Sequence, residues 1–244
     1  MKKSNRIISL ILTLIFLSTI IPTKIVQAST DFDILSEPTA TVEQMKEWAR
    51  KKGAKEFFIE LADIYMEAYK KHGGVNPVVA YAQSAKETGY GKFGGVLDES
   101  YKNPCGLKTN SGGDDKDPNA HHRFNSWEEG ISAHLDHLAL YAGADSYPRK
   151  DTTDPRHSAS LLGKANKVSG LEGLWATAQG YASQLNAMIV EVNNTSIPKK
   201  PSMMRVDNPT GEVEGNVEVY GWALNDAGIK EVKIYLDDKY LGSA

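Results

Sequence analysis

The spacing of apolar residues differs between the two ends of this chain, and that difference limits the folds available to it. Over most of residues 41–192 apolar side chains recur about every three to four positions, as in segment 55–71, which predicts amphipathic helices. Over residues 210–244 the period becomes two, as in segment 217–223, which predicts strands. We therefore expect a mainly α-helical domain followed by an all-β module. Because a β-sandwich needs about 100 residues, this module is expected to be incomplete.

The two segments that flank the helical domain have their own composition. Residues 1–28 place basic residues before an apolar stretch and end in small residues, which is the pattern of a secretory signal peptide cleaved after Ala28. Residues 29–40 are polar and predict a disordered lead-in. Residues 193–209 hold three prolines and predict a semi-extended linker. After cleavage, no membrane span is expected.

Charge and cysteine content exclude some classes of function. Without the four basic residues of segment 1–28, the chain has 24 Lys and Arg against 31 Asp and Glu, a net charge of −7. Nucleic-acid partners usually require a basic face, so none is expected. The single cysteine, Cys105, excludes an intrachain disulfide framework. Core packing must therefore hold the domain together.

Local signals divide the helical region into helices and an irregular part. Asn76 followed by Pro77 is an N-cap residue with proline at the first helical position, and it predicts a helix that reaches Glu87 or Thr88. Residues 94–125 lose the helical period and are rich in glycine, asparagine and aspartate. This composition predicts irregular structure with a short hairpin, which would form the second wall of a cleft.

Glu87 lies where the helix that begins at Pro77 meets glycines. A carboxyl group at the C-terminal end of a helix meets the negative end of its dipole, which disfavours the ionised form and raises the pKa. The neighbours Ala85, Gly89 and Tyr90 are unsuited to a solvated face and indicate a groove. A carboxylic acid in a sugar-sized groove is the central group of glycoside hydrolysis. The alternative is a solvated glutamate near a helix end.

Other reactive residues have simpler interpretations. Four histidines fall within residues 121–137, but their spacing is not a recognised zinc pattern, and neither a metal nor another cofactor is expected. Cys105 has no orienting partner and no helix N-terminus to lower its pKa, which favours a buried apolar thiol over a nucleophile. Asp114, Asp115 and Asp117 are typical turn residues, although one of them can face the glutamate across the cleft.

Four blocks, in order, resemble the glucosaminidase-domain peptidoglycan hydrolases, which are related to mannosyl-glycoprotein endo-beta-N-acetylglucosaminidases. Residues 80–92, AYAQSAKETGYGK, are similar to the family's glutamate block. Residues 103–108, NPCGLK, resemble its Asn-Leu-Phe-Gly-Ile-Lys segment. Residues 123–131, RFNSWEEGI, resemble its arginine block, and residues 181–185, YASQL, resemble its closing Tyr-Ala-x-x-Leu run.

The resemblance implies a lysozyme-like (α+β), mainly α-helical catalytic domain over residues 41–192. It also implies hydrolysis of the β-1,4 bond after N-acetylglucosamine in peptidoglycan, with Glu87 as the general acid and Tyr181 at the active site. Cys105 replaces a phenylalanine of the family pattern. The residues expected to bind the substrate are Tyr90, Asn103, Gly106 and Lys108.

This chain departs from the family pattern between the second and third blocks. Many relatives carry a second glutamate on a hairpin there, whereas residues 102–127 contain no glutamate. Three mechanisms stay open. An aspartate, for which Asp115 is the candidate, can activate water, or the N-acetyl group of the substrate can act as the nucleophile. A single acid can also drive lytic transglycosylation.

Two functional hypotheses follow. The leading one is a secreted, cell-wall-associated enzyme that acts on peptidoglycan glycan strands as a monomer. The competing one, motivated by the missing glutamate, is a wall-binding module that keeps the cleft but has lost catalysis. Residues 210–244 resemble the bacterial immunoglobulin-like repeats appended to secreted wall enzymes, which implies a role in spacing or wall attachment.

Overall fold

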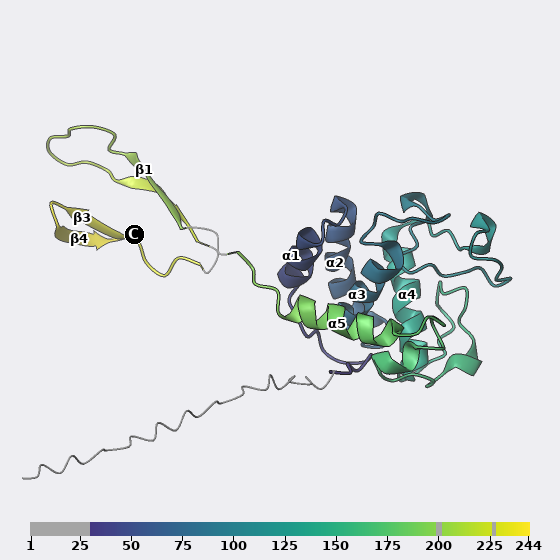
Figure 1. Cartoon of the computed structure of the whole chain (residues 1–244). Coiled ribbons are helices and arrows are strands. Elements are labelled where there is room, and N and C mark those ends of the chain that lie inside the picture. Colours follow the sequence, from purple (N-terminus) through teal and green to yellow (C-terminus); the bar gives the residue numbers. More distant parts are fainter. Residues whose placement is uncertain (1–29, 199–201, 226–227) are drawn as a thin grey trace, which may run out of the picture.

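The structure, a computed structural model, describes residues 30–198, 202–225 and 228–244 (Figure 1). The predicted signal segment 1–28 lies outside these residues. A mainly α-helical domain precedes a small β region, and no helix in the described part combines the length and apolar character needed to cross a bilayer. The α-helices are α1 (Val42–Lys51), α2 (Glu56–Ala68), α3 (Pro77–Thr88), α4 (Trp127–Ala142) and α5 (Tyr181–Asn193).

Local chemistry explains where these helices begin and end. At the start of α1, the side chains of Thr41 and Gln44 cap each other's backbone N–H groups, as in a capping box. At the start of α3, the Asn76 side chain accepts a hydrogen bond from the amide of Val78. The same helix ends at Gly89, whose φ of 58° is the left-handed conformation that glycine adopts readily. Gly89 therefore fixes the direction that the chain takes after Glu87.

Helix α3 is the central helix of the domain. It packs against α1, α2, α4 and α5, and its Val78, Val79, Ala82 and Ala85 side chains are fully buried. The small alanines allow the neighbouring helices to approach closely. Because each large apolar side chain contributes about 1.5–3 kcal/mol when buried, this packing can hold the domain without a disulfide.

Residues 30–40 are ordered, contrary to the expected disordered lead-in. Ile34 is fully buried in the core. Its N–H donates to the carbonyl of Asn166 at 2.9 Å, and its carbonyl accepts from the N–H of Asn76 at 2.8 Å. Ala40 is also buried, and Phe32 and Leu35 pack against the core. These apolar side chains anchor the segment because distant parts of the chain supply backbone partners for it. Local composition does not reveal such partners.

The lobe between α3 and α4 is irregular. It contains two 3-10 turns, Glu99–Tyr101 and Pro118–Ala120. Where a short hairpin was expected, its residues form only an isolated antiparallel bridge between Lys108 and His121. A small apolar cluster joins the lobe to α4, and Cys105 is buried within it. The cluster consists of Cys105, Leu107, Phe124 and Ala133.

The C-terminal region forms two separate antiparallel sheets. Strand β1 (Met203–Asn208) pairs with β2 (Tyr220–Leu224), and β3 (Lys233–Leu236) pairs with β4 (Lys239–Ser243). Strand β1 lies inside segment 193–209, so the expected linker is shorter than its prolines indicate, because β2 provides a backbone partner for it. None of the residues in these strands is buried.

Candidate active site

A cleft of about 730 Å³ lies at the C-terminal end of α3, a volume in the usual range of about 300–1,000 Å³ for ligand sites. One wall is the irregular lobe, including residues 93–97 and 105–108, and the other includes α4 and segment 174–178. The lining mixes aromatic, aliphatic and charged side chains. Such a surface suits a sugar, which presents both apolar ring faces and hydroxyl groups.

Glu87 and Tyr181 meet at this cleft. Glu87 lies in the last turn of α3 and lines the cleft. The hydroxyl of Tyr181, the first residue of α5, donates to Oε1 of Glu87 at 2.5 Å. Tyr181 is only 4% exposed. The packing of α5 against α3 therefore joins two residues that were both expected at the active site and that lie 94 positions apart.

The environment of Glu87 alters its acidity. Glu87 is an exposed residue because it opens to the cleft. The cleft walls nevertheless crowd its carboxyl group, and this desolvation raises the pKa of Glu87 above its usual value. Hydrogen bonding from Tyr181 and Trp175 and the charge of Lys86 act in the opposite direction. The direction agrees with the sequence-based expectation, and burial by the cleft walls adds a cause to the helix position.

Burial and the adjacent Glu87 carboxylate also raise the pKa of Tyr181 far above its usual value. The phenol therefore keeps its proton throughout the physiological pH range. Its hydroxyl group has one hydrogen, which it gives to Glu87. Tyr181 is thus a fixed donor to the carboxyl group and not a nucleophile.

Three of the other expected site residues line the same cleft. They are Gly106, Lys108 and Asp115. The Lys108 ammonium forms an ion pair with Asp115 at 2.6 Å and donates to the carbonyl of Gly113 at 2.6 Å. The Asp115 side chain is 87% exposed, and hydrogen bonding and charge from Lys108 lower its pKa. Asp115 is therefore a stable carboxylate and a weak base.

Two expected substrate-binding residues lie elsewhere. Asn103 is 1% exposed, and its amide donates to the carbonyls of Leu107 at 2.8 Å and His122 at 3.0 Å. It shapes the loop behind the cleft wall instead of facing a ligand. Tyr90 is absent from the cleft lining among the described residues, and its ring lies 5.4 Å from that of Trp48. The left-handed turn after α3 directs this side chain to the α1 side of the core.

Sequence reasoning did not identify Trp175, which lines the cleft. It shares this lining with Glu87, and its side chain acts to lower the pKa of that carboxyl group. Its ring centroid lies 5.6 Å from that of His134 and 5.4 Å from that of His137. Trp175 belongs to an irregular segment that has no regular spacing of apolar residues and no block that resembles the family. The sequence there offers only a lone tryptophan near small residues.

Comparison with known proteins identifies the family. The family model for the mannosyl-glycoprotein endo-beta-N-acetylglucosaminidase, or glucosaminidase, domain matches residues 62–194. The chain belongs to this family. An uncharacterized protein of Borreliella burgdorferi is 31% identical over 119 residues, which are 49% of this chain and 55% of that protein. The chain thus spans about half the length of this curated relative. No solved structure matches the chain.

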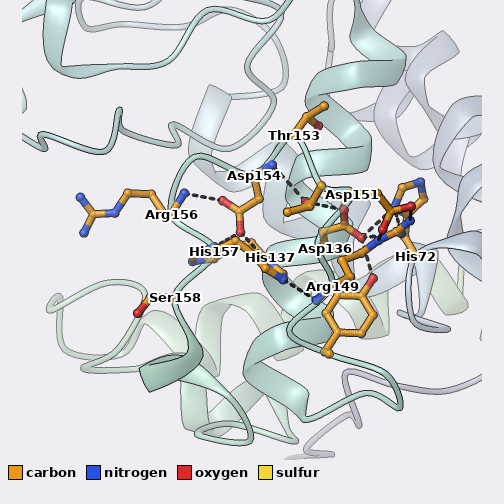
Figure 2. Close-up of polar contacts among 12 residues, drawn as sticks. His72, Asp136, His137, Arg149, Asp151, Thr153, Asp154, Arg156, His157 and Ser158 are labelled. Atoms are coloured by element: carbon orange, nitrogen blue, oxygen red, sulfur yellow. Dashed lines mark hydrogen bonds and ion pairs between the residues drawn. The ribbon is translucent and has the colours of Figure 1, made fainter.

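The match to the glucosaminidase domain runs from within α2 to the end of α5 and contains both Glu87 and Tyr181. It also contains the histidines considered as zinc ligands. His137 Nδ1 lies 2.7 Å from Oδ2 of Asp154, and His157 Nδ1 lies 3.1 Å from the same oxygen (Figure 2). In the described part of the chain, no group of three or more His, Cys, Asp or Glu side chains could hold a metal ion.

A second buried carboxylate of the glucosaminidase domain lies on α4 (Figure 2). Asp136 is 1% exposed, and it joins the end of α2 and the loop after α4 to the helix. Its Oδ1 lies 2.8 Å from His72 Nδ1, 2.5 Å from the Tyr147 hydroxyl and 3.2 Å from Arg149 Nη1. Its Oδ2 lies 2.6 Å from the Thr152 hydroxyl. These hydrogen bonds offset the desolvation of a buried charge and lower the pKa of Asp136. The network is separate from Glu87 and supports the fold.

Proposed function

We propose that this chain hydrolyses peptidoglycan at the β-1,4 glycosidic bond after N-acetylglucosamine, with Glu87 as the general acid. The observation that supports the proposal best is the Glu87–Tyr181 pair in the cleft of a glucosaminidase domain. A carboxyl group with a raised pKa can hold a proton near neutral pH and transfer it to the leaving glycosidic oxygen. Trp175 lines the same cleft and supplies an aromatic side chain for contact with the sugar.

We further propose that the N-acetyl group of the substrate completes the reaction. An inverting enzyme needs a base that takes a proton from water, and Asp115 is a weak base because Lys108 neutralises it. In the N-acetyl route the acetamido oxygen bonds to the anomeric carbon while the bond to the leaving oxygen breaks and Glu87 protonates that oxygen. Water then attacks the anomeric carbon, loses a proton to Glu87 and releases the acetamido group.

Digestion of purified cell wall tests this proposal. The expected product carries N-acetylglucosamine at its new reducing end, and Glu87→Gln should lower kcat by about 1,000-fold or more, since it removes the acid. Glu128→Gln is the matched control, because Glu128 is an exposed glutamate at the start of α4 outside the cleft lining. Full activity of Glu87→Gln would refute the assignment of the acid.

The same digestion separates the alternatives. A product ending in anhydro-muramic acid would indicate a lytic transglycosylase that uses the same acid. Pelleting of the protein with insoluble wall without any sugar release, unchanged in Glu87→Gln, would indicate a wall-binding module. The intact Glu87–Tyr181 pair favours the enzyme, because a binding module has no need of a carboxyl group with a raised pKa.

The same proposal extends to the fold of the helical domain, to the C-terminal module and to the location of the protein. We propose a lysozyme-like arrangement for the helical domain, which its central α3 with a terminal glutamate supports. The paired strands support an immunoglobulin-like module over residues 210–244. The signal-like segment 1–28 supports secretion and association with the cell wall. Recovery of the protein from culture medium or from washed walls tests the last point.

A further inference from the structure

A line of buried hydrogen bonds runs from Glu87 and Tyr181 into the core. Gln83, one turn before Glu87 on α3, places its amide nitrogen 2.8 Å from the Tyr181 hydroxyl. Its amide oxygen lies 3.0 Å from Nε2 of His134 on α4. Nδ1 of His134 lies 2.8 Å from the hydroxyl of Tyr65 on α2. Gln83, His134 and Tyr65 are all 0% exposed.

Once Tyr181 donates to Glu87, the donor and acceptor capacity of each group determines the direction of every other hydrogen bond. The Tyr181 oxygen can then only accept from Gln83, so the Gln83 nitrogen faces it and the Gln83 oxygen faces His134. That oxygen needs a donor, which places the His134 proton on Nε2. Burial lowers the pKa of His134 to about 3, so the ring is neutral and Nδ1 accepts from Tyr65. All four hydrogen bonds therefore point toward Glu87.

The opposite direction has a different chemical consequence. If His134 carried its proton on Nδ1, Gln83 would turn its oxygen toward Tyr181 and take the hydrogen of that hydroxyl. Glu87 would then lose its donor at Oε1 and could place its own proton there, directed into the protein. With Tyr181 donating to Oε1, a protonated Glu87 carries its proton on Oε2 instead. The acid can deliver that proton to a substrate in the cleft.

We propose that Gln83 and His134 are positioning residues that hold the Tyr181 hydroxyl as a donor to Oε1 of Glu87 and so keep the acid proton on Oε2. Tyr65 begins the line as its first donor. The inference rests on the proposed role of Glu87 as the acid, but the arrangement of protons can be observed without any substrate. Nothing in the matched sequence blocks indicated it, because its members come from α2, α3, α4 and α5.

Nitrogen NMR of the folded full chain reads the His134 tautomer directly. A neutral ring with the proton on Nε2 is expected at pH 6, together with loss of that signal in His134→Phe, which serves to assign it. A proton on Nδ1, or a charged imidazolium at pH 6, would overturn the proposal. This result does not depend on whether the protein cleaves peptidoglycan.

Kinetics on cell wall then tests the function of the line. Tyr181→Phe should lower kcat by about 100-fold and Gln83→Met by about 10-fold, with KM nearly unchanged, as for the loss of an oriented donor. The double variant should be no slower than Tyr181→Phe alone, because both changes remove the same hydrogen bond. Additive losses would show that Gln83 acts by another route and would overturn the proposal.

Two Tyr→Phe variants separate an effect on the line of hydrogen bonds from an effect on folding. Tyr65→Phe removes the first donor of the line, and Tyr81→Phe removes an equally buried hydroxyl that donates to the carbonyl of Phe58 at 3.2 Å, outside the line. Tyr65→Phe should lower kcat by about 3- to 10-fold and broaden or shift the His134 signals, while Tyr81→Phe should leave both unchanged. Equal effects of the two variants would contradict the proposal.

Discussion

Substitution of Gly130 by alanine should destabilise this protein, although the residue lies in a helix. In an open helix, Gly→Ala stabilises by about 0.5–1 kcal/mol. Here, a Cβ atom at Gly130 would lie 2.0 Å from the carbonyl oxygen of Lys102 and 3.1 Å from both Pro104 Cδ and the Phe124 ring. Ordinary contacts begin at 3.4 Å, so the backbone that precedes the cleft loop must move by more than about 1 Å.

The expected magnitude follows from these opposing terms. Overpacking of a well-packed site costs typically about 1–3 kcal/mol, and a backbone obstacle places the cost at the upper end. After subtraction of the helix gain, Gly130→Ala should lower the free energy of unfolding by about 2 kcal/mol. Activity should also fall, because the displaced backbone continues into the cleft wall at Gly106 and Lys108.

Urea unfolding, followed by tryptophan fluorescence, measures this change. Gly94→Ala is the control, since a Cβ atom there meets nothing within 4 Å, and its free energy of unfolding should change by less than about 0.5 kcal/mol. If Gly130→Ala is as stable as the parent or more stable, then the contact between α4 and the Lys102 carbonyl does not constrain the loop. The reasoning would then be refuted.

Two further predictions concern carboxylates. Asp136→Asn should lower the free energy of unfolding at neutral pH by about 3 kcal/mol, because the charge of Arg149 loses its buried partner. The folded-state pKa of Asp136 is lowered, so its stabilisation is complete above about pH 4 and is lost as the pH falls through the folded value. Urea unfolding at several pH values should show the variant and the parent converging in acid. Asp115→Asn should lower kcat on cell wall by less than about 3-fold, whereas a loss of about 100-fold or more would identify Asp115 as the base and exclude the N-acetyl route.

The sequence predicted the helices well because their signals are local. Asn76 and Gly89 mark the two ends of α3 through backbone requirements that act within one turn. Strand β1 and the ordered segment 30–40 were missed for the converse reason. Each depends on backbone partners from another part of the chain, and a polar or proline-rich composition conceals that pairing.

In the candidate site, too, the sequence predicted the position of some residues correctly and of others incorrectly. Glu87 and Tyr181 were identifiable because they sit in sequence blocks that resemble a family. Tyr90 and Asn103 sit in the same blocks, yet a block does not show which way a side chain points. Their side chains turn to the Trp48 ring and to the loop backbone. Membership in a matched block therefore does not show which residues line the cleft.

The sequence by itself determined that a helix ends at Glu87 or Thr88, that no disulfide framework exists and that the charge disfavours nucleic acid. These properties depend on composition and on contacts within a few residues. Only the tertiary structure decided that Trp175 lies beside the acid and that Tyr181 donates to one chosen oxygen of it. The reason is physical: the acidity of Glu87 depends on burial and hydrogen bonds supplied by helices and loops far from it in the chain.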